Sequence, residues 1–413
     1  PMSDQTKKML PWAILIGGAL SVVVGMGIRA SFGLFLNPMS LDLGWGREVF
    51  ALALAIQNLM WGAFQPFASA AADKWGSGRV VALGGLLYAG GLTLMSVSTD
   101  PLAFQLSAGL MIGAAQSGCA LAVVLAAVGR AMPPEKRSLG LGLVTAVGAA
   151  GQFSVVPLGQ VFLVNFGWSQ SYLLLAAVSL FIFVGAFLIR DRTKSGATTQ
   201  TAATSGPVLG MVETLRLASR HRGYWLLTTG FFVCGFHVAF IAVHLPAYLT
   251  DLGMPPGTGA WSLSLIGLFN VIGAFSAGIL GGKRSKKYLL SGLYALRSVT
   301  ILVFILMPIS TASVLVFSIA MGLLWLSTVP LTSGLVAQIF GIRYMGTLFA
   351  IVFFSHQVGS FLGVWLGGVL YDVYGTYMPV WWAGVALGLV SALLHLPIND
   401  QTAVDTEKAV AQA

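Results

Sequence analysis

Residues 12–36 read WAILIGGALSVVVGMGIRASFGLFL, an apolar run long enough to cross a lipid bilayer as one helix. The run holds a single charge, Arg29, and apart from Glu48 at the very start of the second span no predicted span contains an acidic residue that could neutralise it. A charge inside a membrane costs at least about 2.5 kcal/mol unless it faces protein or water, so such residues generally serve function. We therefore expect Arg29 to bind an anionic ligand. The alternative is that Arg29 binds backbone carbonyls or reaches the nearby membrane surface.

Similar apolar runs recur along the whole chain. Hydrophobic residues make up 57% of the sequence and charged residues only 8%, with a mean hydropathy of +0.86, which excludes a soluble globular domain. The alternation of a membrane β-barrel is absent, so the sequence predicts an all-α polytopic membrane protein. Its first helix is too long for a signal peptide and is expected to be retained. Twelve transmembrane helices are predicted, near residues 11–36, 48–69, 80–98, 102–128, 139–162, 170–189, 224–248, 260–280, 288–308, 313–338, 346–370 and 377–397.

The positive charges report the orientation of these helices. The formal net charge is +9, yet every Lys and Arg except Arg29, Arg47 and Arg297 falls in the two tails or in alternate loops. This is the bias of cytoplasmic loops, and it predicts that both termini are cytoplasmic, as in a multi-pass protein of a bacterial inner membrane. The basic charge therefore indicates topology, and no nucleic-acid partner is expected. Cys119 and Cys234 lie far apart within spans, so neither a disulfide nor a metal site is predicted.

A polar stretch near the midpoint divides the chain. It predicts a six-helix bundle over 1–190, a cytoplasmic linker over 191–222 and a second six-helix bundle over 223–413. Within the linker, Met211 to Arg222 could form a basic amphipathic helix on the inner leaflet or a solvated tether. Leu87-Tyr88-Ala89 recurs 206 residues later as Leu293-Tyr294-Ala295, and Arg137 and Gly140 recur at the same offset as Arg343 and Gly346. The constant offset predicts two pseudo-symmetric halves.

The loop after the second span carries a motif, Ser69-Ala-Ala-Ala-Asp73-Lys74-Trp75-Gly76-Ser77-Gly78-Arg79. With twelve spans and two halves, it resembles the major facilitator superfamily. The Phe-Gly-x-Phe element at Phe32–Phe35 and the Gly-Trp-Gly-Arg run at 44–47 resemble bacterial members of the monocarboxylate porter and oxalate/formate antiporter group. Monocarboxylate porters of the eukaryotic type carry an acid in helix 1 and an arginine in helix 8. Here those helices carry Arg29 and Asn270, so that arrangement for proton coupling does not transfer.

The resemblance implies that helices 1, 4, 7 and 10 line a central cavity and that helices 2, 5, 8 and 11 flank it. Polar residues on these helices are candidate ligands, because unpaired polar groups are costly in lipid. Phe32 and Trp325 would accept the apolar part of a substrate, although packing is the alternative role for Trp325. The Gln and Asn side chains among the candidates could instead form hydrogen bonds that join helices. The candidate substrate-binding residues are Arg29, Phe32, Gln57, Asn58, Gln116, Gln152, His237, Asn270, Trp325, His356 and Gln357.

Other roles follow from residue type and position. Since the spans hold no Asp or Glu away from their ends, histidine alone titrates there near neutral pH, and His237 and His356 are candidate proton carriers. His244 could act in gating. Arg297 lies on a scaffold helix, where binding backbone carbonyls is the preferred reading and substrate contact the alternative. The family resemblance implies conformational or gating roles for Asp73, Lys74, Arg79, Arg137 and Arg343.

These observations predict a monomeric secondary transporter that works by alternating access. The substrate would be a small organic anion, most simply a monocarboxylate, held by Arg29, with protons as a candidate coupled ion and the lipid bilayer as its surroundings. No cofactor is expected, and no nucleotide-binding loop suggests ATP drive. Broad-specificity efflux of drugs or apolar metabolites is the alternative transport function. An intramembrane enzyme or a solute sensor is disfavoured, because neither a catalytic constellation nor an output domain is evident.

Overall fold

The computed structural model describes residues 4–119, 121–132, 137–189, 211–341 and 345–402, and these residues are helical without strands. The first half contains α1 (Asp4–Ser31), η1 (Phe32–Phe35), α2 (Leu36–Leu43), α3 (Arg47–Trp75), α4 (Ser77–Val97), α5 (Pro101–Phe104), η2 (Gln105–Met111), α6 (Ile112–Cys119), α7 (Leu121–Ala131), α8 (Arg137–Ser179) and α9 (Phe181–Leu188). The second contains α10 (Met211–Arg220), α11 (Arg222–Asp251), α12 (Gly257–Lys283), α13 (Lys286–Leu306), α14 (Thr311–Leu324), α15 (Thr328–Phe340), α16 (Met345–Tyr374) and α17 (Met378–His395).

The predicted all-α membrane fold is confirmed. Within the described residues, ten helical runs are long and apolar enough to cross a membrane. One of them, over 143–188, contains two crossings, because the chain reverses at Gly167 (φ 73°). The helix α3, which carries Gln57, Asn58 and Gln65, is not among the ten. Counting both crossings of that run and adding α3 accounts for the twelve predicted spans.

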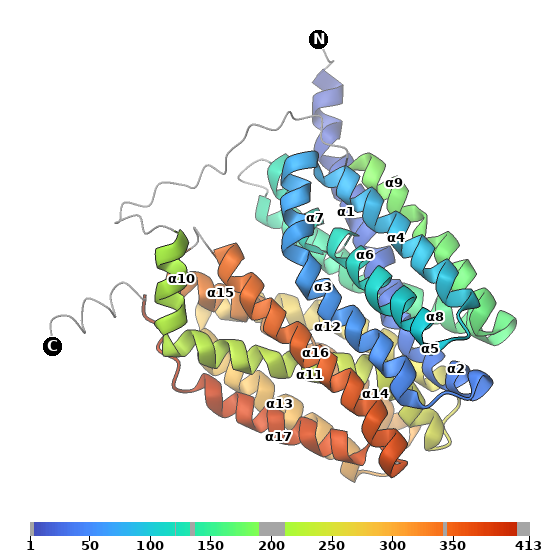
Figure 1. Ribbon diagram of the computed structural model, residues 1–413. Helices are drawn as coiled ribbons and strands as arrows, with labels where there is room; N and C mark the ends of the chain where they lie inside the picture. The colour runs from blue at the N-terminus through green and yellow to red at the C-terminus, as the bar shows by residue number, and fades with distance from the viewer. Residues whose placement is uncertain (1–3, 120, 133–136, 190–210, 342–344, 403–413) are drawn as a thin grey trace.

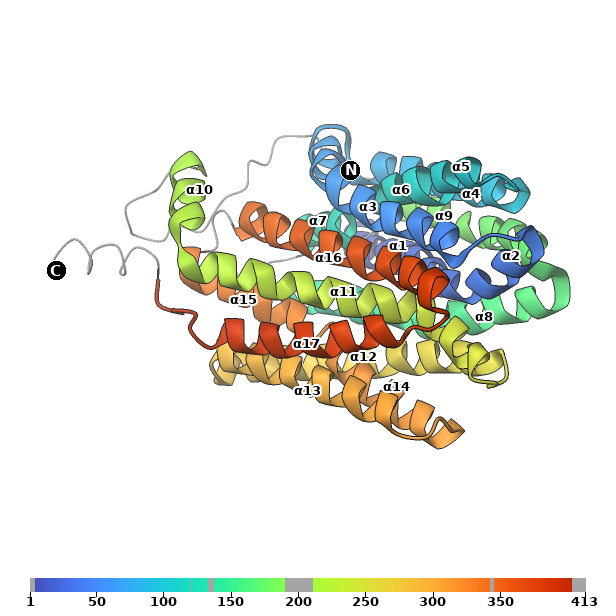
Figure 2. The same cartoon turned by 60° about the horizontal axis from the view of Figure 1, so that its bottom comes forward.

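The helices of each half pack mainly on one another. In the first half α1 packs on α8 and α9, and α4 packs on α6 and α8; in the second, α11 packs on α16 and α17, and α12 on α14. The halves lie side by side (Figures 1 and 2) and meet where α3 packs on α16, α8 on α12 and η1 on α11. The predicted helix in the linker is present as α10. Residues 191–210 lie outside the described residues, and the domain boundaries stay a prediction.

The antiparallel helices give the molecule two ends. We call the end with the loops at 44–46, 252–256 and 375–377 the Arg47 end, and the opposite one, where α1 begins and α17 finishes, the termini end (Figure 1). Glycine allows the halves to approach closely near the Arg47 end. A Cβ added to Gly33 would lie 2.9 Å from the carbonyl oxygen of Val243, and one on Gly368 would lie 2.7 Å from Ala51 Cβ.

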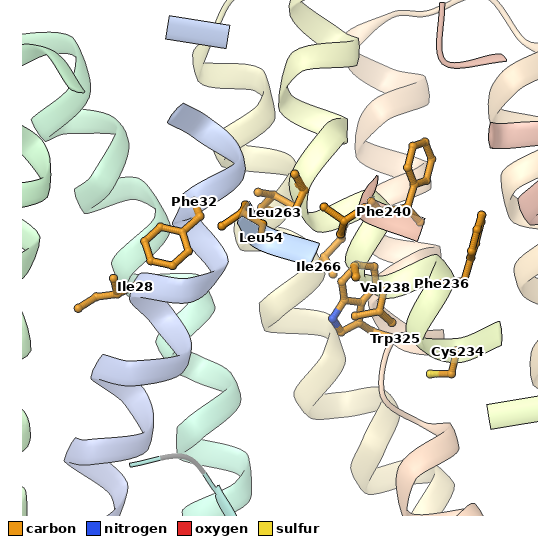
Figure 3. Packing of buried hydrophobic residues seen from close by; sticks show 14 of the residues in the cluster. Ile28, Phe32, Leu54, Cys234, Phe236, Val238, Phe240, Leu263, Ile266 and Trp325 are labelled. Atoms are coloured by element: carbon orange, nitrogen blue, oxygen red, sulfur yellow. The ribbon is translucent and has the colours of Figure 1, made fainter. Parts of the chain in front are cut away.

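Apolar side chains from both halves form the core around this contact. Figure 3 shows Phe32 of η1 and Leu54 of α3 together with Leu263 of α12 and Phe240 of α11, and each of these four is almost fully buried. Large buried side chains stabilise a membrane protein chiefly through packing, since lipid is as apolar as the protein interior. Polar groups set into this core therefore stand out as candidates for function.

Candidate functional site

Arg29 is held from α1 toward α3. One terminal nitrogen, Nη2, donates a hydrogen bond to Asn58 Oδ1, and the guanidinium carbon lies 5.1 Å from the centroid of the Trp61 ring. The side-chain Nε of Arg29 is buried without a partner. None of the ion pairs among the described residues includes Arg29. The guanidinium is therefore a cation positioned by a neutral amide and an aromatic ring. One of its N–H donors has no hydrogen-bond partner.

Asn58 connects Arg29 to the second half of the molecule. Its Nδ2 donates to Leu54 O (2.8 Å), which orients the amide, and its backbone oxygen accepts a hydrogen bond from Gln357 Nε2 on α16 (2.9 Å). Gln357 Oε1 in turn lies 3.1 Å from His356 Nδ1. The result is a continuous polar group, Arg29–Asn58–Gln357–His356, that crosses the contact between the halves. We call it the central polar group.

Aromatic rings border the central polar group. Trp61 packs edge-on against Phe353 of α16 (centroids 5.5 Å apart), and Phe353 lies parallel to the His356 ring (5.8 Å). The ring of Phe231 on α11 is tilted against the His356 ring, with the two centroids 5.0 Å apart. These rings place apolar surface beside the central polar group, and they come from both halves.

The other amides predicted as ligands join helices in the structure. Gln57 Nε2 donates to Ala108 O (2.8 Å), and Gln116 Nε2 donates to the Tyr88 hydroxyl (2.9 Å), both within the first half. Gln152 Nε2 donates to Leu263 O (2.8 Å) and so bridges α8 and α12. Phe32 is buried edge-on to Tyr172. None of these four residues belongs to the central polar group.

A break in the helix between α14 and α15 explains the position of three more predicted residues. Arg297 Nε donates to Leu324 O (3.0 Å), and its Nη2 donates to the carbonyls of Leu324 and Trp325. Within the break, Leu326 N donates to Asn270 Oδ1 (3.1 Å). Trp325 is buried near Val238 and Ile266 (Figure 3). Arg297 thus binds backbone carbonyls, as preferred from the sequence.

His237 also lies away from the central polar group. One ring nitrogen, Nε2, is 2.7 Å from Gly384 O on α17, and the ring is buried inside the second half. Its other nitrogen, Nδ1, is buried without a partner. Of the two predicted proton carriers, only His356 therefore lies beside Arg29 and its partners. Both assignments stay predictions.

Three of the residues predicted for gating, Asp73, Lys74 and Arg79, lie at the termini end. Asp73 Oδ1 accepts a hydrogen bond from Arg130 Nη1 (3.1 Å), and Arg130 Nη2 donates to Ser77 Oγ (2.6 Å), all within the first half. Lys74 lies 5.5 Å from the Trp75 ring, and Arg79 lines a shallow surface pocket. Arg343 lies outside the described residues, as does the side chain of Arg137.

A second cluster joins the halves at the Arg47 end, and its inter-half role did not follow from the sequence. Arg47 makes a two-pronged ion pair with Asp251 of α11 (2.6 and 2.7 Å) and donates to the Tyr377 hydroxyl (2.8 Å). Asp372 of α16 accepts the backbone N–H groups of Arg47 (2.9 Å) and Glu48 (2.8 Å). Arg47, Asp251, Asp372 and Tyr377 are called the Arg47 latch.

Charge balance favours this latch. Burial opposes the charged form of Arg47, which precedes its predicted span, but hydrogen bonds and charges from Asp251 and Tyr377 outweigh it and raise the Arg47 pKa. The guanidinium also lies 3.7 Å over the Tyr371 ring.

A surface pocket of about 600 Å³ at the same end is lined by Asp42, Gln160, Trp168 and Pro256, and it does not include Arg29.

Sequence reasoning missed several members of these sites. Trp61 follows Asn58 by three residues, so helical spacing alone places both on one face of α3 and could have identified Trp61. No local pattern links Arg47 with Asp251 or Asp372, because more than 200 residues separate them along the chain. Only the matching of opposite charges in loops at one membrane face could have suggested the pairing.

Two bundles of membrane-length helices, joined at one end and sharing polar groups at their contact, define a multi-pass membrane transporter. The chain belongs to the Major Facilitator Superfamily, whose sequence pattern matches residues 18–364. The resemblance expected from the motif at the junction of α3 and α4 is therefore confirmed. The members of this family are transporters rather than enzymes.

Individual relatives add detail. The chain is 24% identical to the uncharacterized MFS-type transporter YcxA of Bacillus subtilis, with 98% of this chain and 100% of that protein covered. It is 28% identical to monocarboxylate transporter 13 of Rattus norvegicus, with 89% and 83% covered. A solved structure of a bacterial homolog of the human lysosomal transporter Spinster, in an inward-facing and unoccupied conformation, is similar at a TM-score of 0.68 with 13% identity. The similarity covers 99% of this chain and 96% of the chain in that structure. At this low identity it shows only that the two proteins share a fold.

Proposed function

We propose that the protein is a secondary transporter of small organic anions, with monocarboxylates as its substrates and Arg29 as the group that binds the carboxylate. One observation carries the proposal. Arg29 is a cation in the membrane interior, paired with no carboxylate among the described residues, and its buried Nε lacks a partner. A planar guanidinium fork matches a carboxylate, and a charge-assisted pair is most stable where water is scarce. Similarity to monocarboxylate transporters supports the same substrate class.

Transport would proceed by alternating access. Among the described residues, the hydrogen bonds between the halves include Gln357–Asn58, Gln152–Leu263 and those of the Arg47 latch. These bonds occupy the region between the middle of the molecule and the Arg47 end. Arg29 sits at the inner limit of this closed zone. Opening at the latch, together with closure at the termini end, would expose Arg29 to the other side of the membrane.

The proposal includes a cellular orientation. With both termini in the cytoplasm of a bacterium, the Arg47 latch would face outward across the inner membrane and the conformation would be open to the cytoplasm. A monomer that couples the anion to a proton by symport is the simplest working unit. Cysteines introduced at the termini end should then react with impermeant thiol reagents only in inverted membrane vesicles.

The binding experiment uses the purified full chain. We expect lactate, pyruvate or acetate to raise the apparent melting temperature, because a ligand that binds only the folded state stabilises it. Arg29→Gln should weaken this binding about 10- to 100-fold, since a hydrogen bond to a charged group contributes about 1.5–3 kcal/mol. Arg29→Lys should retain part of the affinity. Arg216→Gln, a matched change at an exposed arginine on α10, should leave binding unaltered.

Two outcomes would decide against the proposal. If Arg29→Gln folds and binds carboxylates as tightly as the parent protein, Arg29 is not the ligand. If liposomes exchange labelled cationic or apolar drugs but no labelled acids, the alternative of broad-specificity efflux is correct. Counterflow with both kinds of compound separates the two functions without assuming a direction of transport.

A further inference from the structure

His244 on α11 lies beside Tyr377 of the Arg47 latch and is fully buried. Its Nε2 is 2.8 Å from Val364 O on α16, and its Nδ1 is 3.2 Å from the Tyr377 hydroxyl. That hydroxyl also accepts the hydrogen bond from Arg47 Nη1. A single chain of hydrogen bonds therefore connects Arg47 in the first half, through Tyr377, to an imidazole in the second half.

The partners fix the protons along this chain. A carbonyl oxygen can only accept, so Nε2 of His244 must carry a hydrogen that it donates to Val364 O. The Tyr377 oxygen already accepts from Arg47, and its own hydrogen is then directed at Nδ1 of His244. In this arrangement Nδ1 is an acceptor. The closed latch therefore requires the neutral imidazole with the Nε2–H tautomer.

A proton on Nδ1 would disturb the closed latch. Tyr377 would lose its acceptor and would have to turn its hydrogen away, and a second cation would then share the oxygen that Arg47 uses. Tyr377 and the Arg47 guanidinium act on His244 directly. Tyr371 and Tyr248 pack against Tyr377. The carboxylates of the latch are already engaged, Asp251 by the Arg47 side chain and Asp372 by two backbone N–H groups. Burying an additional unpaired charge is costly.

We propose that His244 is a proton-binding site that couples proton uptake to opening of the Arg47 latch. The closed conformation holds His244 neutral, and the open conformation exposes Nδ1 to water, where it takes up one proton by forming an N–H bond. A lower pH then raises the population of the open state, because the proton binds His244 only in that state. The inference deepens the proposed function, because it assigns the coupled ion to the latch rather than to His237 or His356.

The test measures opening directly in the full chain. Spin labels are attached at Leu41→Cys and Leu306→Cys, exposed positions of opposite halves at the Arg47 end, while the native Cys119 and Cys234 are buried. Distances are measured in lipid nanodiscs at pH 8.5 and pH 5.5. An imidazole with the reference pKa of about 6.5, protonated only in the open state, raises the open-to-closed ratio about tenfold over this range.

His244→Gln should abolish the response, with a ratio that changes less than about twofold between the two pH values. The matched control is His237→Gln, which changes another buried histidine of α11 that is bonded to Gly384 O and lies outside the latch. This control should respond like the parent protein. The proposal is overturned if the parent shows no pH response, if His244→Gln keeps it, or if His237→Gln loses it equally.

A second variant covers the case in which His244→Gln does not fold. Tyr377→Phe keeps the ring but removes the hydroxyl that links Arg47 to His244, and it should raise the open population at pH 8.5 and reduce the pH response. An unchanged response in Tyr377→Phe would also overturn the proposal. Carboxylate thermal shifts on the same preparations separate the two proposals. Opening by protons without any carboxylate shift contradicts the proposed substrate, whereas the reverse result contradicts the proton site.

Discussion

Two intramembrane arginines show how the surroundings decide the role of one residue type. Arg297 is fully buried and donates to the carbonyls that the break between α14 and α15 leaves free. Arg29 is partly exposed, holds one amide oxygen and has an unpartnered Nε. In the sequence, both are charges within predicted spans, where a charge is costly in free energy. The first satisfies backbone carbonyls of the fold, and the second keeps an unused hydrogen-bond donor.

We predict that Arg297→Met lowers the free energy of unfolding by about 3 kcal/mol, because it leaves buried carbonyls without donors. The measurement is the apparent melting temperature of the purified protein without ligand, which should fall more for Arg297→Met than for Arg29→Met. Carboxylate binding by the folded fraction should persist. A variant that melts like the parent but no longer binds carboxylate would instead place Arg297 at the substrate.

At this scale the sequence identified the unusual residues but not their partners. Arg29, Asn58, His356 and Gln357 were all candidates, and they form one group in the structure. Gln57 and Gln116 had the same residue type and similar positions, yet they face neighbouring helices of their own half. The direction in which an amide points depends on the rotation of its helix, which strongly apolar sequences leave poorly defined.

Among the elements, α3 depends on the other half of the molecule. Its first backbone N–H groups would be unsatisfied at a free helix terminus, and Asp372 of α16 accepts two of them. The carboxylate also places a negative charge at the positive end of the helix dipole. The N-terminus of α3 is thus completed only while the halves are in contact at the Arg47 end.

Asp372→Asn should therefore favour opening. We expect the closed-to-open ratio to fall about fivefold, since the lost charge and acceptor correspond to about 1 kcal/mol. The spin-label pair at positions 41 and 306 measures it. Asp42→Asn is the control, because Asp42 lies at the same end but bonds Trp168 within the first half. Equal effects of the two changes would mean that general surface charge, and not the cap on α3, holds this end closed.

Helix boundaries followed closely from apolar runs, whereas the interruption of one span did not. The run over 313–338 was expected to be continuous, yet α14 ends at Leu324 and α15 begins at Thr328. Pro330 has no N–H to donate to the carbonyl four residues earlier, so the sequence held a signal for the break. Its stabilisation by Arg297 and Asn270 comes from other helices, and nothing local could reveal it.

For the whole molecule, the proposed function predicts that carboxylate binding and opening of the Arg47 end are linked in both directions. If carboxylate binding at Arg29 changes the open-to-closed ratio by some factor, opening must change the carboxylate affinity by the same factor. Asp372→Asn, far from the substrate, should consequently alter carboxylate affinity by up to about fivefold while leaving Arg29 and its partners intact. Thermal-shift titrations and distance measurements on one preparation compare the two factors. A latch variant that opens fully without any change in affinity would show that the two regions act independently.

The architecture of the two halves was accessible from the sequence because repetition leaves a trace. Tyr88 and Tyr294, displaced by 206 residues, lie fully buried on α4 and α13. Their contacts nevertheless differ, since Tyr88 donates to Gly25 O while Tyr294 stacks on His395. Shared ancestry of the halves predicts helix positions, but the polar contacts that distinguish their functions have to be seen in three dimensions.

The cap that Asp372 places on α3 also makes the backbone itself a reporter. While the latch is closed, the amide hydrogens of Arg47 and Glu48 are bonded to a carboxylate of the other half, and each opening releases them to water. Their rate of exchange with deuterium should thus follow the frequency of opening. Acid, substrate and latch variants could be compared in the unlabelled protein by mass spectrometry of the one peptide that contains the start of α3.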